Sequence, residues 1–412
     1  MDSPSGALIV PRLYPCSGGA LPLRGTALDD PVSFTPGAIA WEDGIITYAG
    51  PADGLGGDTQ GLHGACIVPG FVDCHTHLPF FGWRSNEFAA RLAGRSYRDL
   101  HGEGGIPRSA TMLAEASDDE VLVFCRRLLA EMAEHGTTTL ELKTGYGLSV
   151  EGELRQARLA RALAEEAPQT CTVTLLCHAV PSGWERAEWV SAFAGEVIPA
   201  AVAEGLADAV DIYVEDIAFT LDDLRAVAEA AHAAGLPVRC HADQLGASGA
   251  AEVAVEIGAR SADHLNNTGS GGVAALGSAE RTVAVLLPAS SLMLRAAPPP
   301  VGDLVAAGAA LALSTDFNPG TSPVCSMPEV VTLGCSLYGL SAEVALAAVT
   351  INPAWVLGMH DWLGSLEPGK RADFVVLDAE DFVAVPYRPG HNPIARTYIG
   401  GVAVEPEVGR LA

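Results

Sequence analysis

The sequence has few charged side chains, and few of those are positive. Lys and Arg together number 24 of 412 residues, against 50 Asp and Glu, which gives a formal net charge of −26 at pH 7. Such an excess of negative charge is repelled by phosphate backbones and by anionic lipid headgroups, so it argues against nucleic-acid binding and against docking on membranes. We interpret it as a solvated acidic surface, and an anionic substrate would then need its own local cation.

Paired cysteines and long apolar runs are also missing. The nine cysteines are scattered and odd in number and form no C-x-x-C motif, so we expect no disulfide framework and a location in the reducing cytoplasm. Residues 1–6 lack the basic segment and apolar core of a secretory signal. No uninterrupted apolar stretch is long enough to span a bilayer. With 49% hydrophobic residues, the chain is instead expected to form a large, compact core.

The first 65 residues differ in pattern from the rest of the chain. Short apolar segments at residues 7–10, 37–41 and 44–48 are separated by Gly, Pro and other turn residues, which is typical of a small antiparallel β unit. Residues 382–404 again resemble short strands. We therefore predict that residues 1–65 and 362–412 pair into one small β domain, and that residues 66–361 form the main domain.

From Cys66 onward, strand-like segments alternate with amphipathic helical segments, the pattern of βαβ units and a parallel sheet. Eight strands are predicted, at residues 67–74, 137–142, 172–177, 209–214, 237–240, 261–264, 282–287 and 310–315. The clearest helices are predicted at residues 119–135, 150–167, 221–234 and 250–257. Gly136 and Gly235 are placed to end two of them. The pattern predicts an α/β fold, a (β/α)8 TIM-like barrel of roughly 250 residues. Residues 84–111 are expected to be a long irregular loop at its active-site end.

Polar side chains stand at the ends of the predicted strands. His75 and His77 follow the first strand, and their i, i+2 spacing puts both on the same side of an extended chain. Either one alone would be an ordinary polar group. His241 and Asp316 follow the fifth and the last strands, and all strand ends meet at one mouth of a barrel. Three imidazoles and a carboxylate suit one divalent metal ion, which would lower the pKa of a bound water and yield a hydroxide nucleophile. Further polar residues end other strands, namely Glu141, Lys143, His178, Glu215 and His264.

These motifs resemble the amidohydrolase superfamily of metal-dependent hydrolases and, within it, the imidazolonepropionase family. The matching stretches are residues 69–77, 84–88, 91–97, 141–148, 178–181, 241–245, 261–265 and 315–323. The resemblance implies a barrel with a small β-sandwich built from both chain ends, and a homodimer. It also implies a hydrolase of histidine degradation that opens the ring of 4-imidazolone-5-propanoate to N-formimino-L-glutamate. One Zn²⁺ or Fe ion per chain would bind His75, His77, His241 and Asp316, and the sequence does not separate zinc from iron.

The resemblance also implies roles for residues around the metal. Those similar to substrate-contacting positions of the family are Arg84, Tyr97, Tyr146, His178 and Asn318. A guanidinium such as that of Arg84 can bind a carboxylate through two hydrogen bonds, and the implied small-molecule substrate carries a propionate. The alternatives are a surface ion pair for Arg84 and an ordinary loop aromatic for Tyr146. Asp316 is expected to accept the proton of the water, and either Asp316 or His264 to return one to the leaving ring nitrogen.

Gln244 helps to decide between this hydrolase and the alternative functions, and Lys143 helps to decide the number of metal ions. Gln244 stands where some members carry Glu, and a neutral amide can only hydrogen-bond to water or substrate. This disfavours an aminohydrolase of a heterocyclic ring, which usually places a Glu shortly after the third metal His. A non-catalytic protein that keeps the barrel but has lost the metal is also disfavoured, because such a protein would not need to retain all four metal ligands.

Lys143 lies on the second predicted strand, too early for the lysine that bridges two metals in some members. We therefore expect one metal and a buried ion pair of Lys143 with Glu141 or Glu215.

Overall fold

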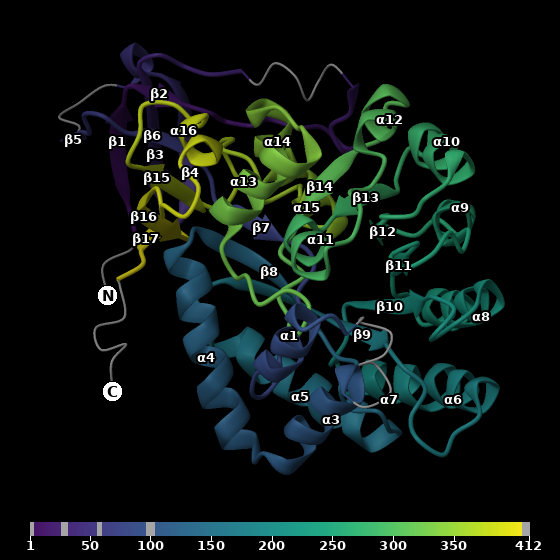
Figure 1. The fold of residues 1–412 in the computed structure, drawn as a ribbon. Coiled ribbons are helices and arrows are strands. Elements are labelled where there is room, and N and C mark those ends of the chain that lie inside the picture. The colour runs from purple at the N-terminus through teal and green to yellow at the C-terminus, as the bar shows by residue number, and fades with distance from the viewer. Residues whose placement is uncertain (1–3, 26–31, 56–59, 96–103, 406–412) are drawn as a thin grey trace.

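The structure, a computed structural model, describes residues 4–25, 32–55, 60–95 and 104–405. Eight parallel strands form one sheet in the order of the chain and curl into a barrel (Figure 1). They are β7 (Phe71–Asp73), β8 (Thr137–Lys143), β9 (Thr170–Cys177), β10 (Ala209–Val214), β11 (Val238–Ala242), β12 (Ser261–His264), β13 (Val283–Leu286) and β14 (Leu311–Leu313). The first and last strands approach one another just beyond their carboxyl ends, where Thr76 bridges Phe317. Each of the eight predicted strands overlaps one of these, so the predicted barrel is confirmed.

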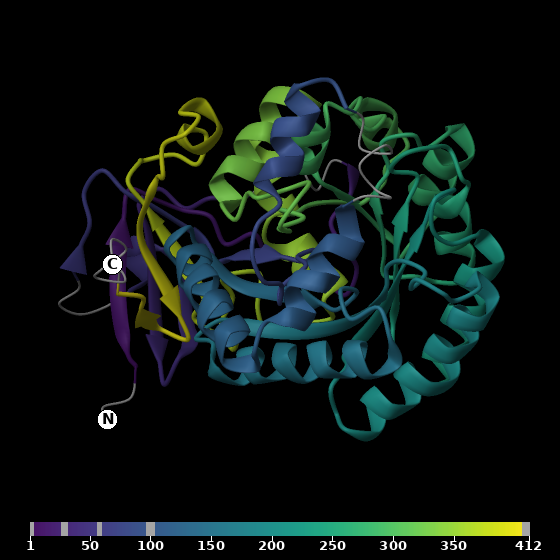
Figure 2. The same cartoon turned by 60° about the horizontal axis from the view of Figure 1, so that its bottom comes forward.

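Helices cover the outside of the barrel (Figure 2). After β7 come α1 (Ser85–Leu92), α3 (Gly105–Glu115) and α4 (Asp118–Glu134), and then α5 (Val150–Glu166), α6 (Arg186–Ala192), the π-helical turn η3 (Phe193–Val197), α7 (Ile198–Ala203), α8 (Leu221–Ala233), α9 (Ala250–Glu256), α10 (Ser270–Ser278), α11 (Pro288–Leu294), α12 (Val301–Ala306), α13 (Met327–Tyr338), α14 (Ala342–Ala348) and α15 (Ile351–Val356). Ser117 caps α4 in a capping box with Glu120, which satisfies backbone N–H groups of the first turn. Gly136 and Gly235 follow α4 and α8 with φ of +87° and +77°, as their predicted role requires.

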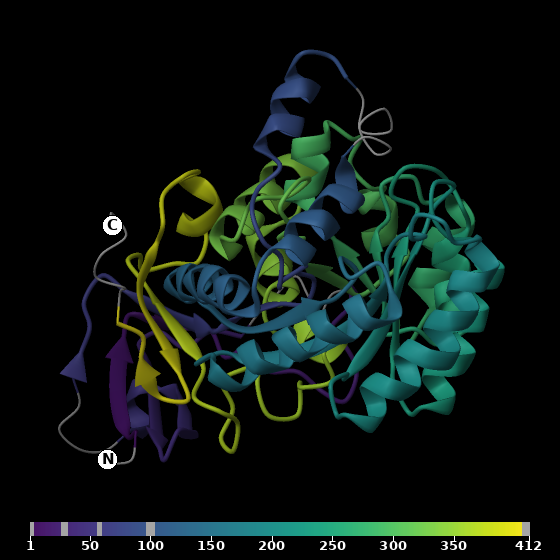
Figure 3. The ribbon, with the colours of Figure 1, turned by 90° about the horizontal axis from the view of Figure 1, so that it is seen from below.

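Two local predictions for the barrel were wrong. The first predicted strand, residues 67–74, is divided at Gly70 into β6 (Cys66–Pro69) and β7, which belong to different sheets. The backbone passes close to Thr138 there, and a Cβ on Gly70 would lie 2.2 Å from Thr138 Oγ1. The segment 84–111, expected to be irregular, contains α1 and most of α3, which project at one end of the barrel (Figure 3).

Both ends of the chain contribute to a small β region beside the barrel, where the purple and yellow strands lie together (Figure 1). One sheet has the order β4 (Ile45–Pro51), β3 (Gly37–Glu42), β1 (Gly6–Val10) and β5 (Gln60–Gly61), and the turn η2 (Ala52–Gly54) follows β4. The other has the order β17 (Val402–Ala403), β16 (Ile394–Ile399), β15 (Phe374–Leu377), β6 and β2 (Arg12–Leu13). A short helix, α16 (Ala384–Tyr387), lies in the region where only strands were expected.

The core of this small β region is apolar and aromatic. Leu8, Ile39 and Trp41 of the first sheet pack in one cluster with Phe374 and Tyr398 of the second. The two sheets therefore share a core, as in the β-sandwich that the sequence implied. In the part of the chain that the structure describes, no helix is long and apolar enough to cross a membrane.

Candidate metal centre and active site

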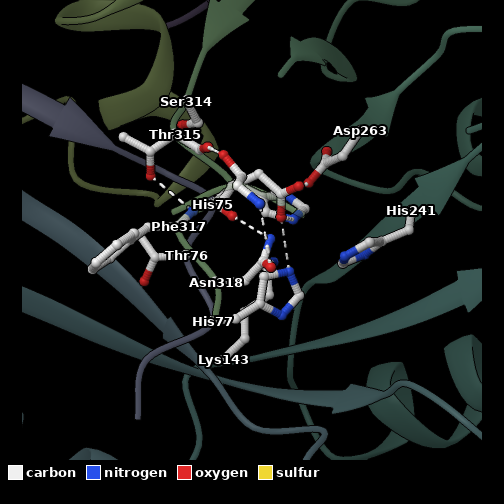
Figure 4. Close-up of polar contacts among 12 residues, drawn as sticks. His75, Thr76, His77, Lys143, His241, Asp263, Ser314, Thr315, Phe317 and Asn318 are labelled. Carbon is white, nitrogen blue, oxygen red and sulfur yellow. Dashed lines mark hydrogen bonds and ion pairs between the residues drawn. The ribbon is translucent and has the colours of Figure 1, made fainter. Parts of the chain in front are cut away.

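Four side chains from distant parts of the chain meet at the carboxyl ends of the barrel strands. His75 and His77 follow β7, His241 lies in β11 and Asp316 follows β14. One ring nitrogen from each of the three histidines lies within 4.8 Å of the other two. Asp316 Oδ1 lies 3.1 Å from His77 Nε2 and 3.7 Å from His75 Nε2. All four are at most 3% exposed, and Figure 4 shows the three imidazoles facing one another. The structure thus brings together the four residues expected to bind the metal.

The hydrogen bonds around these rings fit a metal ion. Asp263 Oδ2 lies 2.5 Å from His75 Nδ1, and Asp211 lies 3.1 Å from His241 Nδ1. Each carboxylate favours the tautomer that carries its hydrogen on Nδ1, which leaves the lone pair of Nε2 for a metal. Among the described residues, Nε2 of His75 and Nε2 of His241 are buried and have no hydrogen-bond partner. Buried nitrogens left in this way are what a bound ion would satisfy.

The electrostatics favour the ligand form of His75, His77 and Asp316. Burial lowers the pKa of His75 well below its usual value and lowers that of His77, so both rings are neutral near pH 7. Burial alone would raise the pKa of Asp316, but the hydrogen bond from His77 and the surrounding imidazoles bring it below its usual value. Asp316 is therefore an anion, and neutral imidazoles with one carboxylate are the forms that coordinate Zn²⁺ or Fe²⁺.

A second group of possible ligands lies elsewhere and fits a metal less well. Glu131 and His135, one turn apart at the end of α4, approach Cys325 in the loop before α13. There, burial raises the pKa of the Cys325 thiol to about 12, and the thiol hydrogen-bonds to Glu131. The thiol and the carboxylate of this group therefore satisfy one another, whereas the ligand nitrogens of His75 and His241 have no such partner among the described residues.

Nine of the eleven predicted site residues line one cavity. They are His77, Arg84, Tyr146, His178, His241, Gln244, His264, Asp316 and Asn318. His75 lies just behind it, and Tyr97 lies outside the described residues. Ile106, Tyr213 and Thr321 also line the cavity, and they were not identified from the sequence. A cavity that combines the metal ligands with a few convergent polar groups has the form of a small-molecule site.

Arg84 brings a positive charge into this cavity. It directly precedes α1, and its backbone N–H donates to Pro319 O at 2.9 Å. Its side chain is 3% exposed, and Arg84 Nε lies 3.5 Å from Glu87 Oε2. Within the described chain, Nε and Nη1 have no hydrogen-bond partner. Gly320 makes room for the guanidinium, because a Cβ there would lie 1.7 Å from Arg84 Nη2. Arg84 therefore keeps donors available for an anionic group.

Tyr146 and His178 form a wall of aromatic rings next to His77. The rings of His178 and His77 are stacked with centroids 5.1 Å apart, and that of Tyr146 lies 6.1 Å from His77. Burial lowers the pKa of His178 well below its usual value, so this ring is neutral. The wall can contact a flat heterocycle.

A buried carboxylate from α5 holds the loop that carries Tyr146. Glu153 accepts hydrogen bonds from the backbone N–H of Gly145 at 2.8 Å and from those of Gly147 and Leu148, each at 2.9 Å. It is 1% exposed. Glu153 was not identified from the sequence, although a Glu in the first turn of a helix just after a glycine-containing loop was a possible signal.

His264 and Gln244 line the cavity from two neighbouring strands, since His264 ends β12 and Gln244 follows β11. Burial lowers the pKa of His264 to about 3, so its ring is neutral at pH 7 and can donate a hydrogen bond. The backbone φ angles of His264 and Asp316 are +76° and +54°, which is the left-handed region. Such conformations cost about 1–3 kcal/mol each and cluster at functional sites. Gln244 is 9% exposed.

Asn318 lines the cavity, but its side chain also organises the loop that carries it. Its Nδ2 donates to Asp316 O at 2.6 Å. Its Oδ1 accepts from the backbone N–H of Gly320 at 2.9 Å and of Thr321 at 2.7 Å. The amide therefore fixes the backbone between Asp316 and the glycine that faces Arg84, and it retains one N–H for a ligand.

Lys143 forms a buried ion pair, as predicted. Of the two candidate partners, Glu141 and Glu215, only Glu141 contacts it among the described residues. Lys143 forms an ion pair with Glu141 and another with Asp211, with Nζ–O distances of 2.7 Å in each. Glu215 instead accepts from the backbone N–H of Leu245 at 2.8 Å. Asp211 and Asp263 were not identified from the sequence, although a charged residue inside the apolar segment 209–214 was a usable signal.

The chain is similar to known proteins over most of its length. A model of the amidohydrolase family matches residues 66–404. An imidazolonepropionase of Rubrobacter xylanophilus is 41% identical over 399 residues, covering 94% of this chain and 95% of its own. One of Mesorhizobium japonicum is 43% identical over 377 residues, covering 88% and 92%.

Solved structures show the same fold at low identity. An adenosine deaminase of Xanthomonas campestris with bound zinc superposes with a TM-score of 0.70 at 18% identity, covering 98% of this chain and 93% of its own. The guanine deaminase of E. coli gives 0.71 at 16%, covering 97% and 99%. The two solved structures support the fold alone. The family is shown by the sequence matches, which are about 40% identical over about nine-tenths of the chain. The chain belongs to the amidohydrolase family and, within it, to the imidazolonepropionases.

Proposed function

We propose that the chain hydrolyses 4-imidazolone-5-propanoate to N-formimino-L-glutamate, a step of histidine degradation. Its likeness to imidazolonepropionases over about nine-tenths of its length supports this activity. The observation that carries the choice of substrate is the buried guanidinium of Arg84, which shares a cavity with His77, His241 and Asp316. A ring placed between them can present its propionate to Arg84 and its carbonyl to the metal ligands.

We propose that His75, His77, His241 and Asp316 hold one zinc or iron ion per chain. When bound, the ion supplies Lewis acidity and an activated water. Both metals accept imidazole and carboxylate ligands, so the chemistry of the four ligands suits either.

The protein side chains supply proton transfer and orientation. Asp316, held as an anion, accepts the proton of the attacking water. His264 is neutral and donates a hydrogen bond to the carbonyl oxygen or to the ring nitrogen, and Asp316 or His264 returns the proton to that nitrogen as the C–N bond breaks. Gln244 hydrogen-bonds to substrate or water, because an amide does not take up a proton near pH 7. Tyr146 and His178 hold the ring in place.

An assay of the purified protein tests this function. We expect the absorbance of imidazolonepropanoate to fall and N-formimino-L-glutamate to appear, both changes being lost with a strong chelator and restored by Zn²⁺ or Fe²⁺. The same protein should release no ammonia from heterocyclic amines, which separates the proposal from an aminohydrolase. Metal bound without turnover of either substrate class would contradict the proposal, and so would turnover that is indifferent to complete removal of metal.

A further inference from the structure

A row of alternating buried charges leads through the barrel interior to a metal ligand. Arg239 contacts Glu141, which contacts Lys143, which contacts Asp211, which contacts His241. Arg239 also donates to Thr174 Oγ1 at 2.8 Å. None of the side chains of Arg239, Glu141, Lys143 and Asp211 is more than 2% exposed. The row thus links β11 to β8, β8 to β10, and β10 back to β11 across the buried interior of the barrel.

Such a row is a poor means of stabilising a core. Moving an ionic group out of water costs several kcal/mol, and well-packed apolar residues often stabilise a protein as much as a buried ion pair does or more. Lys143 does not line the cavity, so it makes no contact with a substrate. The presence of Lys143 at this point therefore calls for a reason other than stability or substrate binding.

The contacts of Asp211 supply that reason. Its Oδ2 accepts from Lys143 Nζ at 2.7 Å, and its Oδ1 accepts from Ile212 N at 2.7 Å while lying 3.1 Å from His241 Nδ1. With both oxygens bound, the carboxylate cannot rotate away from the His241 ring without losing another contact. Asp263, which has the same relation to His75, lacks this support, because its Oδ1 has no hydrogen-bond partner within the described residues.

We infer that Lys143 is a positioning residue of the metal centre. Through Asp211 it holds the His241 ring with Nε2 directed at the ion, and so it sets how tightly the chain binds the ion. This inference rests on the metal centre of the proposed function. Residues that contact a metal ligand directly, as Asp211 contacts His241, typically change metal affinity by about 10–100-fold when they are removed. Lys143 lies one contact further from the ligand, so this range is the upper bound for its removal.

The test is the affinity for Zn²⁺ of folded Lys143→Met, measured by competition with a chelator of known affinity. We expect the affinity to fall measurably relative to the unaltered chain, by up to about 10–100-fold. Lys370, the only other lysine in the sequence, offers a matched control. It lies in a partly buried ion pair, with Nζ 3.1 Å from Glu367 Oε2, and it is distant in sequence from the metal ligands. Lys370→Met should lower the Tm and leave the affinity for Zn²⁺ unchanged.

A double-mutant cycle makes the test specific to the contact with Asp211 and covers the case in which Lys143→Met does not fold. Asp211→Asn and Lys143→Met/Asp211→Asn should bind Zn²⁺ equally, because Lys143 acts only through the carboxylate. The pair removes one charge of each sign, which makes it more tolerable in the core than the single change. A further loss of affinity in the pair would overturn the inference, and so would a Lys143→Met protein that binds Zn²⁺ as the Lys370→Met control does.

The affinity is measured without substrate, so the inference and the proposed function can fail separately. If the unaltered chain binds no ion, the metal centre itself is refuted. If it binds an ion with an affinity that Lys143→Met does not change, only the role of Lys143 is refuted.

Discussion

The interior of the barrel and the interior of the small β region are both closed to solvent but are filled differently. In the small β region, Phe374 stacks on Tyr398 with ring centroids 4.3 Å apart, and Trp41 packs against both rings. In the barrel, Lys143 is fully buried between two carboxylates. Burying apolar side chains stabilises the folded state, whereas burying charged side chains destabilises it unless every charge is paired. We infer from this contrast that the buried charges near the mouth of the barrel serve the proposed metal centre and not the stability of the fold.

The largest effect is expected from the charge at the mouth itself. Asp316→Asn removes an anionic metal ligand and the proton acceptor, so kcat/KM should fall by roughly 10²–10⁴-fold or more. Steady-state kinetics with the imidazolone substrate measure this. Asp361→Asn, at an exposed position, should leave kcat/KM unchanged. Near-normal turnover by Asp316→Asn would remove Asp316 from the mechanism.

In the small β region, the loss of a buried side chain should lower the stability of the fold and leave catalysis unchanged. Phe374 is fully buried, so Phe374→Ala should lower the free energy of unfolding by about 3–5 kcal/mol through lost burial and a residual cavity. Denaturant unfolding measures this, and Phe374→Leu should cost less. Well below the Tm, kcat/KM should be unchanged. A large fall in kcat/KM of the folded variant would show that the two interiors are coupled.

The guanidinium of Arg84 should act on substrate binding. Arg84→Ala removes the proposed partner of the propionate, a loss of about 2–3 kcal/mol that raises KM by roughly 30–150-fold and leaves kcat less affected. Initial rates over a wide range of substrate concentration separate the two constants. Arg126→Ala, which breaks the exposed ion pair with Glu166, is the control and should leave KM unchanged. An unaltered KM in Arg84→Ala would assign Arg84 to the structure of the loop after β14.

The smallest effect is expected from Glu153, whose carboxylate accepts hydrogen bonds from backbone N–H groups of the Tyr146 loop and from the side chain of Thr144. Glu153→Gln places an amide NH₂ against N–H groups that now donate to a carboxylate, so it should lower the free energy of unfolding by about 1–3 kcal/mol. The displaced loop should also raise KM, because Tyr146 moves with it. Thermal unfolding and kinetics measure the two effects, and Glu151→Gln, exposed on the same helix, serves as control. A change in Tm without any change in KM would limit Glu153 to stability.

Much of the site could be expected from local pattern. His75 and His77 were assigned as a pair from their spacing, and His241 and Asp316 from their positions after strands. Tyr97 lies outside the described residues, and the homodimer and the cytoplasmic location stay predictions. The helices α1 and α3 were missed because each is short and lies next to glycines that are typical of a loop, although their apolar residues recur at helical spacing. The division at Gly70 was missed because a strand that changes sheets keeps the same apolar pattern on both sides.

The partners of Lys143 show where sequence reasoning ends. Glu141 could be named because it lies two residues away on the same strand and so on the same side. The choice between Asp211 and Glu215 depended on strand register. Lys143 is level with Thr174, which is level with Ala209, so Asp211 lies two residues beyond that level and Glu215 six. At about 3.3 Å per residue, Glu215 lies roughly 20 Å along the strand direction from the level of Lys143, which is too far for an ion pair.

The amino-acid sequence by itself determined the elements of this protein and the sides on which their side chains lie, because both follow from the local geometry of strands and helices. Only the tertiary structure decided which of those side chains meet. The stagger of eight strands and the closure of β7 against β14 place Asp316 beside His77 and a lysine behind a metal ligand. Residues far apart in the chain acquire neighbours only when the barrel closes.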